Sequence, residues 1–277
     1  MTCYFPIPPS IKNNSKDKIL GSLTFLNFPN NYKKSNQRNI YKKNIFLGTY
    51  ILEKNYWKLL NVVSVPYKEF KEIEREKLNI SDNEMAVVVI SKTNEFPSSC
   101  THLPNPSSLR IDESPVAERA SYNFSYKNNQ TSFQGEYPKA MTSLSKASFF
   151  GFDTLKANTK NEKIINYILF INLNSCSEKQ SNDIVNIFHP KEKNILFQLE
   201  TGENQISVHN LSLLYDSKIS NETLFLSSKS KAYIALILSI DLETCQLSLE
   251  HTHPPAEMAT GMDRHLIVKP IKNNWVI

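Results

Sequence analysis

The stretch that decides the fold begins with IINYILFINL, residues 164–173. It opens a series of short apolar or alternating segments that are separated by turn-forming residues. The others are DIVNIFH (183–189), NILFQLE (194–200), QISVHNLSLLY (205–215), TLFLSS (223–228), KAYIALILSI (231–240), QLSLEHTH (246–253) and HLIVKPIKNNWVI (265–277). Such a series is typical of β-sandwiches and jelly rolls. We therefore predict a mainly β protein, an antiparallel β-sandwich of jelly-roll type.

The N-terminal part adds more strands and one helix. Strands are expected at 19–28, 45–52, 56–65 and 85–90, the second and third of them as a hairpin. The segment PYKEFKEIEREKL, 66–78, starts with a proline and places Phe70, Ile73 and Lys77 at helical spacing. We expect this segment to form a helix that covers a sheet, with a second short helix at 138–146.

Prolines and serines gather between residues 93 and 117, where the hydrophobic pattern loses its periodicity. Such a composition is typical of a loop or linker. We predict a basic, β-rich N-terminal region at 1–92, a linker or long loop at 93–117, and a β-sandwich domain at 118–277.

The composition excludes several classes of function. Only six glycines occur, against about nineteen expected at average usage, and neither G-x-G-x-x-G nor the P-loop motif is present, so no nucleotide cofactor is expected. The four cysteines are far apart and the start resembles no signal peptide, which favours a reducing, cytoplasmic setting. The longest apolar run, 232–240, is much shorter than the roughly 20 residues of a membrane span.

The densest group of chemically active side chains lies at 247–257, LSLEHTHPPAE. Because side chains alternate along a strand, His251 and His253 share the face of the preceding leucines, while Glu250 points away. Neutral imidazoles suit a divalent metal, and Glu257, with His265 or Asp263, can complete the set after the prolines. The alternative is that His251 and His253 are half-buried strand residues that bind no metal.

The spacing His251-x-His253-x-x-x-Glu257 resembles the first metal-binding box of the cupin jelly rolls. The resemblance implies that these three side chains hold a metal inside a small barrel. It covers only these seven residues: Cys245 and Arg264 stand where the cupin pattern has glycine, and no second box follows.

A second group of polar residues lies on the predicted hairpin at 119–137. Ser121, Asn123 and Ser125 share one strand face, and Arg119, Gln134 and Glu136 are near in sequence. Such a stripe suits a sugar or another hydroxyl-rich ligand. An ordinary solvent-exposed face is the simpler interpretation.

The segment 30–43 is basic, with interleaved tyrosines and no acid. Residues 1–80 hold 14 of the 32 basic residues but only 6 of the 27 acidic ones. Phosphate backbones and other anionic partners bind such patches, although a solvated loop is the simpler interpretation and no nucleic-acid-binding motif is present. The contact residues would be Lys33, Lys34, Arg38, Lys42 and Lys43.

Three hypotheses for the function therefore stand side by side. The first is a divalent-metal protein that acts on a small polar, sugar-like substrate through His251, His253, Glu257 and His265. The second is a non-catalytic binding or assembly module that contacts an anionic partner through 30–43. The third is a carbohydrate-binding β-sandwich that uses the 119–137 hairpin. The sequence decides neither between an enzyme and a binding protein nor the oligomeric state.

Overall fold

The protein is built from antiparallel β-sheets. The computed structural model describes residues 2–13, 17–27, 43–107, 120–135, 137–139, 142, 148–152, 163–178, 181–188, 195–214, 224–228 and 234–251. Within these residues the complete helical elements are two short 3₁₀ turns, η2 (Arg75–Leu78) and η4 (Leu211–Leu213). Of the predicted short helix at 138–146, Lys139 and Thr142 have 3₁₀ conformation, and most of the segment lies outside the described residues. The prediction of a mainly β, antiparallel sandwich is confirmed, and the jelly-roll topology stays a prediction.

Contacts within the chain divide it into two compact units. Unit 1 comprises Met1–Phe124, Ser132–Lys139 and Ser175–Lys179. Unit 2 comprises Ser125–Thr131, Ala140–Asn174 and Gln180–Ile277. The described part of the Pro-rich segment, 93–107, falls within unit 1. The predicted role of 93–117 as a linker stays a prediction.

Unit 1 contains two sheets. The first has the order β11-β1-β7-β4-β5-β8. Its strands are β11 (Tyr137–Pro138), β1 (Cys3–Pro6), β7 (Ala86–Ser91), β4 (Ile45–Glu53), β5 (Tyr56–Val65) and β8 (Ser99–Cys100). The hairpin of β4 and β5 is the one expected from the sequence, and a register shift between Thr49 and Tyr50 leaves Leu60 unpaired on β5.

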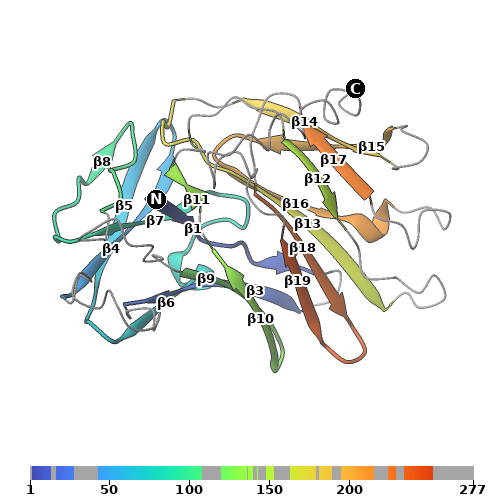
Figure 1. Ribbon diagram of the computed structural model, residues 1–277, viewed down its shortest axis with the longest axis horizontal. Helices are drawn as coiled ribbons and strands as arrows, with labels where there is room; N and C mark the ends of the chain where they lie inside the picture. Colours follow the sequence, from blue (N-terminus) through green and yellow to red (C-terminus); the bar gives the residue numbers. More distant parts are fainter. Residues whose placement is uncertain are drawn as a thin grey trace, which may run out of the picture. The chain divides into compact units, whose positions relative to one another are not determined.

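The second sheet has the order β10-β9-β3-β2, and β6 also pairs with β3 (Figure 1). It belongs to unit 1 except for the tip of the β9–β10 hairpin, Ser125–Thr131, which belongs to unit 2. Its strands are β10 (Asn129–Gln134), β9 (Ala120–Tyr126), β3 (Lys18–Leu26), β2 (Ile11–Lys12) and β6 (Phe70–Glu74). The two sheets share a core, in which Phe5 of β1 meets Phe25 of β3 edge to face at 4.8 Å between ring centroids.

The predicted helix at 66–78 is wrong. Phe70–Glu74 is strand β6, antiparallel to the end of β3, and only Arg75–Leu78 turns as a 3₁₀ helix. Arg75, which is not on the predicted helix face of Phe70, Ile73 and Lys77, has a buried side chain. Pairing with β3, some fifty residues earlier, outweighs the local pattern, as tertiary context often does.

Unit 2 also contains two four-stranded sheets, β12-β17-β14-β15 and β16-β13-β18-β19 (Figure 1). The first comprises β12 (Ser148–Phe152), β17 (Leu224–Ser228), β14 (Asn182–Phe188) and β15 (Ile195–Gly202). The second comprises β16 (Gln205–Asn210), β13 (Ile164–Asn172), β18 (Ile234–Asp241) and β19 (Leu247–His251). Side chains of both sheets form one core: Ile168, Phe170, Ala235 and Ile237 from one, Val185, Ile187, Leu199 and Leu226 from the other, with Leu211 of η4. Unit 2 is therefore a sandwich in its own right.

Candidate functional site

A row of polar side chains crosses one face of the sheet formed by β9, β3 and β6. On β3 the buried Leu23 and Phe25 alternate with Ser22 and Thr24, which therefore point to the opposite face. The register pairs Ser22 with Glu74, Thr24 with Glu72 and Leu26 with Phe70. Paired residues of antiparallel strands share a face, so both strands present their polar side chains together.

Hydrogen bonds connect these side chains across three strands. The Asn123 Nδ2 group on β9 donates to Thr24 Oγ1 at 2.8 Å and to Ser22 Oγ at 3.3 Å. The Ser22 hydroxyl donates in turn to Glu72 Oε1 at 2.5 Å. The row therefore has its geometry fixed before any ligand arrives, which lowers the entropy lost on binding.

Exposure rises along this row. Asn123 and Ser22 are buried, Thr24 is half-buried, and Glu72 is exposed. Phe70, on the same face of β6, has 65% of its surface exposed, an unusual position for an aromatic residue. We call Ser22, Thr24, Phe70, Glu72 and Asn123 the polar face: it offers hydroxyl, amide and carboxylate groups beside an open aromatic ring.

Ion pairs neutralise the two acids that follow Glu72 at alternate positions. Lys77 Nζ lies 2.6 Å from Glu74 Oε1, and Lys18 Nζ lies 3.0 Å from Glu76 Oε1. The hydrogen bond from Lys18 is the main cause that lowers the pKa of Glu76. Within the described residues no lysine or arginine pairs with Glu72. The exposed charge of the polar face is therefore that of the Glu72 carboxylate.

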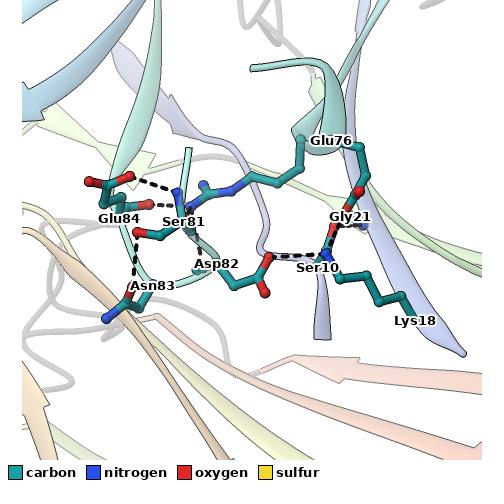
Figure 2. A network of polar contacts seen from close by, with 9 residues as sticks. Ser10, Lys18, Gly21, Glu76, Ser81, Asp82, Asn83 and Glu84 are labelled. Carbon is teal, nitrogen blue, oxygen red and sulfur yellow. Dashed lines mark hydrogen bonds and ion pairs between the residues drawn. The ribbon is translucent and has the colours of Figure 1, made fainter. Parts of the chain in front are cut away.

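Arg75 holds the segment that follows the polar face. Its buried guanidinium donates to the backbone carbonyls of Ile7, Ser81, Asp82 and Glu84. Figure 2 labels the last three of these residues. Burial lowers the pKa of Arg75 to about 10. Since its bonds go to backbone oxygens, Arg75 acts as a structural anchor for η2 and the loop after it.

The same region ties β3 to the N-terminal segment. Figure 2 shows Lys18 directed at Asp82, and Glu76 close to Ser10 and Gly21. The Gly21 N–H donates to Ser10 Oγ, and a Cβ at Gly21 would lie 2.3 Å from the Pro9 carbonyl oxygen. Because that obstacle is backbone, only glycine fits at position 21.

Only the first of the four predicted metal ligands lies in the described part of the chain. On β19, Leu247 and Leu249 are half-buried whereas Ser248 and Glu250 are exposed, so the predicted alternation is confirmed up to Glu250. His251 ends the strand opposite Leu236, but its side chain is outside the description.

His253, Glu257 and His265 lie outside the described residues. Among the described residues, no three His, Cys, Asp or Glu side chains are grouped to hold a metal. The metal set stays a prediction.

Of the residues predicted to bind a sugar, the structure places Asn123. The hairpin of β9 and β10 forms with its turn at Lys127, whose φ of 53° is left-handed. Gln134 lies on β10 with its side chain outside the description, and Arg119 and Glu136 are outside it altogether. Asn123 is brought together with Ser22, Thr24 and Glu72, none of which was predicted as a site residue.

The missed residues had only a weak signal in the sequence. Ser22 and Thr24 alternate with apolar residues in ILGSLTFL, which indicates a strand face but no partner. Glu72 and Phe70 were placed on a covering helix, away from any sheet face. Among the basic residues, Lys43 is exposed, while Lys33, Lys34, Arg38 and Lys42 lie outside the described residues, so the anionic-partner contact stays a prediction.

The four cysteines form no disulfide. In the part of the chain that the structure describes, no helix has the length and hydrophobicity to cross a membrane. Comparison with protein-family models, with curated proteins and with solved structures finds no match to this chain. The argument for a function therefore starts from the polar face.

Proposed function

We propose that the protein is a carbohydrate-binding β-sandwich that holds a saccharide on the polar face. A sugar ring presents hydroxyl groups around its edge, each a donor and an acceptor, and C–H groups on its faces. Hydroxyl, amide and carboxylate side chains complement the edge. An exposed aromatic ring complements the C–H surface, because it supplies a flat apolar area.

The observation that carries this proposal is the hydrogen-bonded row from Asn123 through Ser22 to Glu72, with Phe70 exposed beside it. Asn123 and Ser22 are buried and satisfy each other's hydrogen bonds within the sheet, so the row holds Glu72, which is exposed beside Phe70, in place. A pre-organised row next to an open aromatic ring has the composition expected of a binding site.

The test is a screen of immobilised glycans, followed by calorimetric titration of the best one. The variant Phe70→Ala removes the aromatic surface, and we expect it to weaken binding at least tenfold. The matched control is Tyr56→Ala, which removes another exposed aromatic residue of unit 1 (53% exposed) from β5, a strand of the other sheet. The control should bind as the wild type does.

Two results would contradict the proposal. One is that no glycan of the screen binds, and the other is that Phe70→Ala and Tyr56→Ala bind equally well. Circular dichroism of both variants excludes misfolding as the cause of a difference.

We propose as a second function that the C-terminal histidines bind a divalent metal. What supports it is the alternation along β19, in which Leu247 and Leu249 are half-buried between exposed residues. A continued strand pattern predicts that His251 shares their face. With His253, Glu257 and His265 the set would offer three imidazoles and a carboxylate, which suit zinc or another divalent transition metal. An open coordination position would then polarise a bound sugar-like substrate.

Metal analysis of protein purified without a histidine tag tests this second proposal. We expect about one equivalent of metal in the wild type and a loss of most of it in His251→Ala. The control, His102→Ala, changes an exposed histidine of unit 1 and should keep its metal. Metal well below one equivalent in the wild type would contradict the proposal.

A further inference from the structure

Most hydrogen-bond donors of the polar face already bind acceptors within the face itself. An amide nitrogen has two N–H groups, and both of those on Asn123 are directed at hydroxyls, of Ser22 and of Thr24. The Ser22 hydroxyl proton is directed at Glu72. The groups that remain for a ligand are mostly acceptors. They are Glu72 Oε2 and the lone pairs of Glu72 Oε1 that Ser22 does not use.

Among the described residues, the charge of this face is negative. Glu72 is exposed and has no cationic partner within the described residues, whereas Glu74 is paired with Lys77. Lys71 precedes Glu72 on β6, and neighbouring residues of a strand point to opposite faces, so its side chain leaves the opposite side of the strand. A net charge of +5 for the whole chain therefore coexists with a local carboxylate.

We infer that the polar face selects amino sugars: the ammonium group of a 2-amino-2-deoxy sugar binds Glu72 while its ring packs on Phe70. This inference rests on the proposed function. An ammonium group offers three donors and a positive charge, which match an acceptor-rich, negative site. The same carboxylate repels the carboxylate of a uronic acid, so acidic saccharides are rejected.

Glu72→Gln is the variant that isolates this charge. The glutamine side-chain oxygen still accepts the hydrogen bond from Ser22, so the row keeps its geometry while the charge is lost. The matched control is Glu53→Gln, which removes an exposed carboxylate of β4 that is paired with Lys58 and lies outside the polar face.

The experiment compares three oligosaccharides of equal length by calorimetry: a glucosamine oligomer, its N-acetylated counterpart and an oligogalacturonate. Titrations are made at low salt and a mildly acidic pH, at which the sugar amine is protonated. For the wild type and Glu53→Gln we expect the glucosamine oligomer to bind about fivefold more tightly than the N-acetylated one, the upper range for an exposed ion pair. The oligogalacturonate should bind most weakly. In Glu72→Gln the first two should bind equally, and added salt should reduce the wild-type preference.

The outcomes separate the inference from the proposed function. If the N-acetylated oligomer binds but the wild type shows no preference for the amine, the inference fails while the carbohydrate site stands. The inference also fails if Glu72→Gln keeps the preference or if the oligogalacturonate binds best. If none of the three oligomers binds, both the inference and the proposed function fail for this class of sugars.

Discussion

The sheet β16-β13-β18-β19 of unit 2 and the sheet β10-β9-β3-β2 of unit 1 treat their two faces differently. In the first, β18 is buried at every position from Ile234 to Ile240, and β13 is buried on both faces from Ile165 onward. In the second, β3 buries Leu23 and Phe25 on one face and turns Ser22 and Thr24 to the other. The difference separates a sheet whose two central strands are buried on both faces from a sheet whose central strand turns a polar face away from the core.

The few polar groups inside the unit 2 sheet support this distinction. Ser239 of β18 donates to Asn166 Oδ1 of β13 at 2.5 Å, and both side chains are buried. They satisfy each other's hydrogen bonds away from water, as buried polar groups must. The row of unit 1 that begins at Asn123 instead leads outward through Ser22 to the exposed Glu72.

The largest expected effect comes from comparing alanine substitutions at two phenylalanines, one in each unit. Phe170 of β13 is fully buried in the core of unit 2, whereas Phe70 of β6 is 65% exposed. Phe170→Ala should lower the free energy of unfolding by about 3–5 kcal/mol, through lost burial and the cavity left behind. Phe70→Ala should change it by less than about 0.5 kcal/mol. Urea denaturation of both variants measures the change in unfolding free energy. Similar losses of stability in the two variants would contradict the difference drawn between the two sheets.

Arg75 is the buried polar group of unit 1 on which η2 depends, and its removal should have the next largest effect. Arg75→Met keeps much of the side-chain volume but removes the donors to four backbone carbonyls. We expect a loss of about 2–4 kcal/mol, since each buried group left without a partner costs about 1–3 kcal/mol. The control Lys77→Met removes only a surface ion pair and should cost no more than about 1 kcal/mol. Equal unfolding midpoints for the two variants would show that the guanidinium is dispensable.

Tyr4 provides a smaller, pH-dependent test of the unit 1 core. Burial raises the pKa of its phenol from 10.0 to about 12. The folded state therefore holds this proton more tightly than the unfolded state does, so the contribution is fully present below pH 10 and is lost as the pH rises toward about 12. Tyr50, whose pKa burial also raises, acts in the same direction.

The corresponding measurement is stability against pH for the wild type and Tyr4→Phe. The variant should lose about 1–2 kcal/mol less between neutral pH and strongly alkaline pH, since one pKa unit corresponds to about 1.4 kcal/mol. Tyr56→Phe, at an exposed tyrosine, should follow the wild-type curve. A Tyr4→Phe curve that also coincides with the wild type would contradict the assignment.

Much of this fold could be predicted from the sequence. The apolar run 231–240 correctly indicated a strand, which the structure describes from Ile234 onward and buries up to Ile240, and the alternation at 119–126 placed Asn123 on a polar face. The prediction that failed is the helix at 66–78. The helical spacing of its residues favoured a helix, but the segment contains a strand whose partner lies far away in the chain. Two of the five residues of the polar face, Phe70 and Glu72, were missed with it, because they belong to that strand. A polar row formed by strands distant in sequence depends on a register that no local pattern specifies.

The most direct test of the carbohydrate-binding face is an NMR titration of isotope-labelled protein with the best-binding oligosaccharide. The account predicts that chemical-shift changes concentrate in 20–26, 70–74 and 121–125, the parts of β3, β6 and β9 that carry the polar face. The account would be contradicted if saturation with the oligosaccharide shifts the NMR signals of β5 or of unit 2 and leaves the signals of these three segments unchanged.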